Sequence, residues 1–127
     1  MATINLKPVF LTIISILFAL SVFSQDTTDK ESSEYFVVLY TIGANWDTTK
    51  PAHEQLYFKE HSLHLSALRK SKKIDIGGRY SDKGMIILKV RDENEAKTLI
   101  TKDKAVQNEI FKTEIFPFSP FYKGCIE

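Results

Sequence analysis

Four stretches of the chain have the residue pattern of β-strands. Residues 35–42 (YFVVLYTI) are almost all β-branched, aromatic or aliphatic, which predicts a strand buried on both faces. Residues 73–80 and 85–90 predict two more strands, because 81–84 (SDKG) between them has the residue types of a hairpin turn. Residues 109–116 predict a last strand, which ends where prolines interrupt regular pairing.

Two further stretches have the spacing of amphipathic helices. In residues 52–70, apolar side chains recur three and four positions apart and form one helical face. Residues 92–102 predict a shorter helix that Asp92 caps, with Glu95 three positions later as in a capping box. The order strand, helix, strand, strand, helix, strand predicts an α+β fold of the ferredoxin-like βαββαβ type. In this fold an antiparallel sheet carries both helices on one face.

The first predicted strand also has apolar side chains on the sheet face that the two helices cannot cover. A second copy of the same sheet, packed face to face, buries both open surfaces at once. We therefore predict a homodimer that forms through the open sheet face.

The first 24 residues differ in composition from the rest of the chain. They contain one charged side chain, Lys7, and an apolar run from Val9 to Phe23. This pattern predicts a secretory signal peptide over residues 1–24, cleaved after Ser24. The apolar run of 15 residues is shorter than the roughly 20 that a membrane span needs, so cleavage is favoured over an uncleaved anchor. We expect an exported protein, periplasmic or extracellular, without stable membrane insertion.

Three segments follow the predicted cleavage point. Residues 25–33 (QDTTDKESS) are polar and without periodicity, which predicts a disordered lead. Residues 34–122 form the predicted domain, and 123–127 form a short C-terminal tail that contains Cys125, the single cysteine. A single cysteine forms no internal disulfide, so we expect the hydrophobic core and a partner subunit to stabilise the fold.

The charge balance gives no indication of a polyanionic partner. Removal of residues 1–24 takes away Lys7 and no acidic residue, so 17 basic residues become 16, against 16 acidic residues. The densest basic run, 69–73 (RKSKK), lies where the first predicted helix ends and complements its dipole. We therefore expect no nucleic-acid partner.

Two of the three histidines lie three positions apart in the first predicted helix. His61 is in the middle of the apolar face, where a buried neutral histidine with one hydrogen bond would give the same pattern as a functional one. His64 lies off that face and is interpreted as a partly exposed surface residue. The spacing differs from the zinc-protease motif and no third ligand is near, so we predict no metal site. The pair Gly77-Gly78 predicts close approach to the backbone by a helix side chain or a ligand.

The order and spacing of these features resemble the YCII-related domain family, whose fold is a dimeric α+β barrel of ferredoxin-like units. The resemblance covers about residues 34–122. It rests on the tyrosine-containing first strand, His61 followed by Leu65 and Leu68, the 16-residue interval from His61 to Gly77, the pair Gly77-Gly78, residues 96–103 (AKTLITKD), and Pro117-Phe118 at the end of the last strand.

The resemblance implies a site made of His61, on the first helix, and Asp103, just after the second. An aspartate that accepts a hydrogen bond from one ring nitrogen fixes the histidine tautomer and leaves the other nitrogen as a general base or acid. The expected function is a cofactor-free acid/base enzyme, lyase-like or isomerase-like, that acts on a small carbonyl-containing substrate. Two further residues are candidates for binding an anionic or polar ligand in the same cleft. They are Tyr40, in the first predicted strand, and Arg79, which follows the double glycine.

Two alternatives stay open. The first is a ligand-binding or purely structural dimer in which His61 is a packed core residue. The second is a cofactor-free monooxygenase of the same barrel architecture, whose cleft does not require Asp103. The acid/base hypothesis requires the His61 ring and the Asp103 carboxylate to lie within about 4 Å of each other or to share a bridging water.

Overall fold

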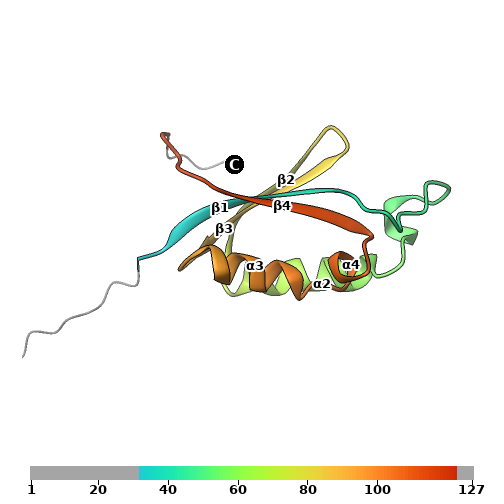
Figure 1. Cartoon of the computed structure of the whole chain (residues 1–127), viewed down its shortest axis with the longest axis horizontal. Helices are drawn as coiled ribbons and strands as arrows, with labels where there is room; N and C mark the ends of the chain where they lie inside the picture. Colours follow the sequence, from blue (N-terminus) through green and yellow to red (C-terminus); the bar gives the residue numbers. More distant parts are fainter. Residues whose placement is uncertain (1–31, 123–127) are drawn as a thin grey trace, which may run out of the picture. The chain divides into compact units, whose positions relative to one another are not determined.

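A computed structural model describes residues 32–122 of the chain. This part of the protein is an α+β fold in which the helices lie on one side of a four-stranded antiparallel sheet (Figure 1). The elements in chain order are β1 (Glu34–Ile42), the 3₁₀ turn η1 (Ala52–Glu54), α2 (Phe58–Lys70), β2 (Ile74–Tyr80), β3 (Lys83–Val90), α3 (Glu93–Thr101), α4 (Lys104–Gln107) and β4 (Phe111–Pro117).

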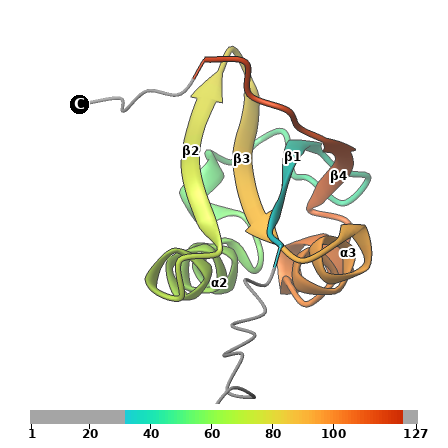
Figure 2. The ribbon, with the colours of Figure 1, turned by 90° about the vertical axis from the view of Figure 1, so that its left-hand side faces the viewer.

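The strands are arranged in the order β2-β3-β1-β4, so β1 is a central strand with β3 on one side and β4 on the other (Figure 2). Both pairings of β1 are antiparallel, and Tyr40 lies opposite Gly84 of β3 and Thr113 of β4. Strands β2 and β3 form the predicted hairpin, in which Arg79 pairs with Gly84. The ends of β1, β2 and β3 therefore come together at Tyr40, Arg79 and Gly84.

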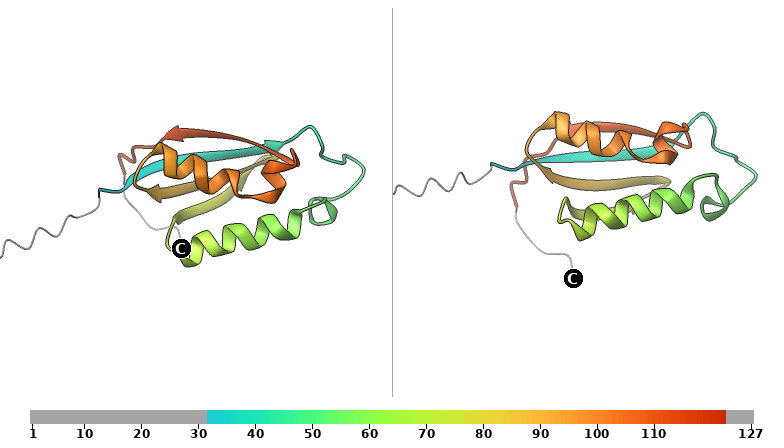
Figure 3. Two further views of the ribbon diagram at one scale, coloured as in Figure 1. Left: turned by 60° about the horizontal axis from the view of Figure 1, so that its bottom comes forward. Right: turned by 90° about the horizontal axis from the view of Figure 1, so that it is seen from below.

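The two faces of β1 differ in burial. The side chains that face the helices are buried: Phe36, Val38 and Tyr40. On the opposite face, Tyr35, Val37 and Leu39 are only half-buried, and Phe116 of β4, which lies opposite Val37, is 48% exposed. In the single chain only the face of this strand that lies against the helices is buried, and burial of the other face depends on the predicted second copy. The helices cover one face, where α2 lies beside α3 and α4 (Figure 3).

The first predicted helix, 52–70, is interrupted. Residues 52–54 form a 3₁₀ turn, Gln55 is extended, and Tyr57 has a left-handed backbone with φ 60° before α2 begins at Phe58. The Gln55 side chain is buried and bonds to three backbone groups of the preceding loop, with Nε2 donating to the Asp47 and Lys50 carbonyls and Oε1 accepting from the Asp47 N–H. These bonds hold Gln55 in the loop, so α2 starts at Phe58, six residues later than the apolar spacing predicts.

The second predicted helix, 92–102, occurs as α3, and a separate short helix follows it at Asp103. Asp92 caps α3 by accepting a hydrogen bond from the Glu95 N–H at 2.8 Å, as its position predicts. After Lys102 the chain turns, and Asp103 caps the short helix α4 by accepting from the Ala105 N–H at 2.9 Å. This second cap buries the Asp103 side chain completely, at 0% exposure.

Several predicted segments lie outside the described residues. These are the signal peptide 1–24 with its cleavage point after Ser24, most of the disordered lead 25–33, and the tail 123–127 with Cys125. Within residues 32–122, every helix is too short or too polar to cross a membrane.

The close approach of the chain at Gly43 generates a stability prediction. A Cβ atom at Gly43 would lie 2.0 Å from the Glu109 carbonyl oxygen, whereas a Cβ at Gly78 would meet nothing within 4 Å. We expect Gly43→Ala to lower the free energy of unfolding by about 1–3 kcal/mol, because the backbone has to move apart. Gly78→Ala is the matched control and should change stability little. Urea unfolding of both variants checks this, and equal stabilities would contradict the close contact between Gly43 and Glu109.

Candidate functional site

His61 and Asp103 meet across the helical layer. His61 projects from α2, Asp103 lies at the junction of α3 and α4, and the two residues are 42 positions apart in the chain. The His61 Nδ1 and Asp103 Oδ2 atoms are 2.5 Å apart. Because an ionised carboxylate can only accept, Nδ1–H is the donor. The contact that the acid/base hypothesis requires is therefore present, and the other ring nitrogen, Nε2, has no hydrogen-bond partner within residues 32–122.

Both oxygens of Asp103 accept hydrogen bonds, Oδ2 from His61 and Oδ1 from the Ala105 N–H. Burial alone would raise the pKa of this carboxyl group. The hydrogen bond and charge of His61, together with the Ala105 N–H, outweigh burial and hold the pKa of Asp103 below its ordinary value of 3.8. Asp103 is therefore an anion at neutral pH that orients the His61 ring.

Aromatic rings surround His61. Its ring centroid is 4.7 Å from Phe111, 5.4 Å from Tyr40 in an edge-on arrangement, and 6.1 Å from Phe58. Trp46 extends this group, with its ring 5.5 Å from Phe111. The His61 side chain retains 11% exposure. It is thus held firmly on three sides while still reaching a surface.

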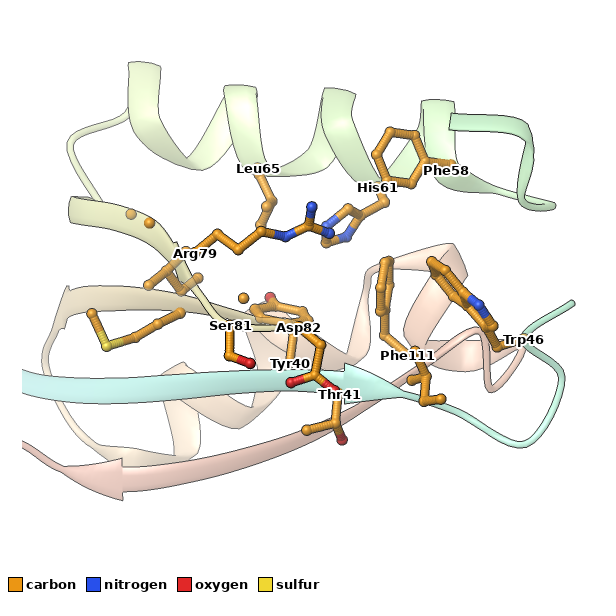
Figure 4. A pocket seen from close by; sticks show the side chains of 16 residues that line it. Tyr40, Thr41, Trp46, Phe58, His61, Leu65, Arg79, Ser81, Asp82 and Phe111 are labelled. Carbon is orange, nitrogen blue, oxygen red and sulfur yellow. The ribbon is translucent and has the colours of Figure 1, made fainter. Parts of the chain in front are cut away.

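That surface is the wall of a pocket between α2 and the sheet (Figure 4). The pocket has a volume of about 560 Å³, which is within the range of small-molecule sites. Its lining is mainly apolar, with a few polar groups. The residues that define its character are Tyr40, Trp46, Phe58, His61, Arg79 and Phe111.

Tyr40 forms part of the pocket and has an unusual hydroxyl group. The residue is 5% exposed, and its hydroxyl has no hydrogen-bond partner among the described residues. Burial, with a further contribution from the negative charge of Asp103, raises the pKa of the Tyr40 phenol far above its usual range. Tyr40 is therefore a hydrogen-bond donor at neutral pH and lacks an acceptor.

The remaining predicted site residues also line this pocket. Gly77 and Gly78 form its wall on β2, and a Cβ at Gly77 would make only ordinary contact with Ile86, 3.5 Å away. No helix side chain lies within 4 Å of the Cβ position of either glycine, so the absence of a side chain at these two residues enlarges the pocket. Arg79 is exposed, extends from β2 across the pocket in Figure 4, and forms no ion pair within the described part of the chain.

His64 lies apart from this site. Its Nε2–H donates to the Leu99 carbonyl at 2.9 Å and so joins α2 to α3. It is half-buried, as the sequence predicts, and its role is to connect the two helices. Among residues 32–122, no three histidine, cysteine, aspartate or glutamate side chains are grouped so that they could hold a metal ion.

Several lining residues were not predicted to belong to a site. Phe111 and Trp46 form the aromatic wall, and Ser81 and Asp82 at the β2–β3 turn form part of the rim. Nothing in their sequence pattern indicates a site, because Phe111 reads as a residue of the last strand and Trp46 as a residue of a loop. Strand pairing brings them to His61, and a single sequence does not contain that information.

Comparisons of this chain with protein-family models, with curated proteins and with solved structures find no significant match. The class of the protein is therefore defined by its own geometry. It is an α+β domain with a small-molecule-sized pocket, whose lining includes His61, a histidine that is hydrogen-bonded to the buried Asp103.

The depressed pKa of Asp103 generates a prediction on acid stability. In the unfolded chain this carboxyl titrates near 3.8, and in the folded protein it titrates at lower pH. The charge of Asp103 therefore stabilises the fold at pH values above the pKa of the unfolded chain. This contribution is lost as the pH falls through the pKa of the folded protein. We expect Asp103→Asn to cost about 1–3 kcal/mol near neutral pH, since one buried donor loses its acceptor, and less near pH 3.

Urea unfolding at several pH values checks this expectation. Asp82→Asn is the matched control, because Asp82 is exposed and should give the same small change at every pH. A destabilisation by Asp103→Asn that is independent of pH would contradict an ionised Asp103 in the fold.

Proposed function

We propose that this protein binds a small carbonyl compound in the pocket and uses His61 as a general base and acid. The observation that carries the proposal is that His61 lines the pocket while its Nδ1 atom lies 2.5 Å from Asp103 Oδ2. Asp103 fixes the tautomer with the proton on Nδ1, so Nε2 is the nitrogen that can take a proton from a substrate. Asp103 is a positioning residue, because it acts through His61.

The chemistry that fits this arrangement is proton abstraction next to a carbonyl group, followed by return of the proton. Isomerisation and elimination both begin in this way, and His61 can perform the proton transfers with its own ring. The apolar lining suits a compact, mainly apolar substrate body. Tyr40 and Arg79 are the polar groups placed to bind its oxygen atoms, and Gly77 and Gly78 leave room for it.

The topology supports the ferredoxin-like assignment and, with it, the resemblance to the YCII-related family. With α3 and α4 taken as one helical segment and the turn η1 left out, the elements follow one another as βαββαβ, and the sheet order β2-β3-β1-β4 with antiparallel neighbours agrees with this unit. The meeting of His61 with Asp103 is what that resemblance implies. Family membership remains a proposal that rests on these features of the chain.

Hydrogen–deuterium exchange tests the proposed reaction class. The purified protein is incubated in D₂O with enolisable ketones and oxo acids such as phenylacetone and phenylpyruvate, and loss of the proton signal beside the carbonyl is followed by NMR. We expect exchange above the buffer rate, and we expect His61→Gln to lower it by at least about 100-fold, since the base is removed.

His53→Gln is the matched control, because the His53 side chain is 73% exposed and does not line the pocket. Exchange by this variant should equal that of the wild type. The proposal is lost if His61→Gln exchanges as fast as the wild type does, or if no compound of this class exchanges above the buffer rate.

A second candidate function is ligand binding without a reaction, with His61 as a packing residue. The aromatic contacts of His61 favour it, because rings within about 6 Å on three sides also describe a core histidine. The two functions differ in the His61→Gln variant. A packing role requires a lower melting temperature and unchanged ligand affinity, whereas the catalytic role requires loss of exchange in a protein that remains folded.

We also propose that the protein is a homodimer through the open face of the sheet. The half-buried side chains Val37 and Leu39 and the exposed Phe116 provide an apolar surface there. A second copy of the face would bury these side chains in a symmetric contact and give the dimeric α+β barrel that the resemblance implies.

Light scattering after size-exclusion chromatography tests the dimer. We expect the wild type to have twice the mass of one chain at micromolar concentration and Val37→Glu to have the mass of one, because the substitution places a charge at the centre of the proposed contact. Ser66→Glu, on the exposed side of α2, should remain a dimer. A wild-type protein that is a monodisperse monomer would end this proposal.

A further inference from the structure

The Tyr40 hydroxyl is a buried donor that the fold leaves without an acceptor among residues 32–122. Nearly all buried polar groups in proteins form a hydrogen bond, so one that does not is a sign of strain or of a missing ligand. The Tyr40 ring is fixed on two sides, with its centroid 5.4 Å from that of His61 and 6.0 Å from that of Phe111. The hydroxyl therefore belongs to a side chain that lines the pocket beside the ring that we propose as the base.

Arg79 is the cation of the pocket. It lies opposite Gly84 in the hairpin, and Gly84 in turn lies opposite Tyr40, so strand register places Arg79 two strands from the phenol. Figure 4 shows its side chain extending across the pocket between α2 and the sheet. Because the Arg79 side chain forms no hydrogen bond or ion pair with a described residue, it can move aside for a ligand without losing a bond.

We infer that the pocket takes an oxo acid, with Tyr40 donating a hydrogen bond to the carbonyl oxygen and Arg79 binding the carboxylate. This inference rests on the proposed function and names the substrate class of the same site. The aromatic side chains Trp46, Phe58 and Phe111 form the wall against which a flat apolar substrate body packs.

The two roles fit one proton-transfer step. The carbon–hydrogen bond next to the carbonyl breaks, and its proton moves to His61 Nε2. The electron pair forms a carbon–carbon double bond, and the carbonyl π electrons move to oxygen, which becomes an enolate. Tyr40 keeps its proton and strengthens its hydrogen bond as charge develops on that oxygen, while Asp103 stabilises the protonated His61 ring. Return of the proton from Nε2 to carbon completes the cycle.

The raised pKa of Tyr40 agrees with this role, since a phenol that stays protonated can donate to an enolate. Asp82 also lines the pocket and carries a negative charge. It lies on the β2–β3 turn, and Figure 4 shows it on the side of Thr41 and away from His61. The carboxylate-binding role therefore falls to Arg79.

Tyr40→Phe tests the inference because it removes the hydroxyl and keeps the ring. We expect deuterium exchange of phenylpyruvate to fall by about 100-fold, as for the loss of one donor to a developing oxyanion. The melting temperature should equal or exceed that of the wild type, since an unpartnered buried group is removed. Tyr80→Phe is the matched control, because Tyr80 is 44% exposed and outside the pocket.

Arg79→Gln tests the carboxylate contact. We expect the wild type to exchange phenylpyruvate at least about tenfold faster than the uncharged phenylacetone, each relative to its buffer rate, and the variant to lose this preference. Lys89→Gln, which removes an exposed cation from β3 outside the pocket, should retain it. An unchanged preference in Arg79→Gln would overturn the assignment of Arg79.

Binding of 4-nitrophenol separates this inference from the proposed reaction, because its ionised form resembles an enolate, is coloured and needs no catalysis. We expect Tyr40→Phe to weaken binding of the ionised form by about tenfold or more. If neither the wild type nor the variant catalyses exchange, but Tyr40→Phe still weakens binding of 4-nitrophenol, the proposed reaction fails and the oxygen-binding role of Tyr40 stands. If Tyr40→Phe matches the wild type in binding, or in an exchange reaction that the wild type does catalyse, the inference is overturned.

Discussion

The hydrogen bond between His61 and Asp103 fixes the helix α2, which forms part of the pocket, to the junction of α3 and α4. Asp103 ends one helix and caps the next, so its carboxylate is fixed by the backbone at Ala105 as well as by the His61 ring. The bond joins α2 to the α3–α4 junction above the sheet. Because Asp103 is fully buried, its charge is tolerable only with these partners, and removal of either one leaves a polar group without compensation. The position of the His61 ring follows from this constraint.

Around this bond the protein concentrates polar groups that have no partner of their own among residues 32–122. These groups are Nε2 of His61, the Tyr40 hydroxyl and the Arg79 guanidinium, and their residues belong to three different elements and line one pocket. By contrast, the buried Gln55 and the half-buried His64 form hydrogen bonds, Gln55 in the loop and His64 at Leu99. Polar groups without protein partners in a mainly apolar pocket are typical of a small-molecule site, because a ligand can form the hydrogen bonds that the protein does not.

Elements governed by short-range patterns were well predicted from the sequence. The strands, the β2–β3 hairpin and the Asp92 cap depend on residues a few positions apart, and each occurs close to its expected place. The error arises where a contact outside the helix overrides the local pattern. The start of α2 is delayed by the buried Gln55, which bonds to the loop before it.

The site shows the same division. The sequence by itself determined an α+β fold with a four-stranded antiparallel sheet, since periodicity and turn residues are local properties. It also marked His61 and Asp103, although only through a resemblance in order and spacing. Tertiary structure alone decided that their side chains meet at 2.5 Å, that Phe111 and Trp46 complete an aromatic wall, and that the Tyr40 hydroxyl lacks an acceptor among the described residues. Strand register and helix packing set these distances, and both depend on residues far apart in the chain.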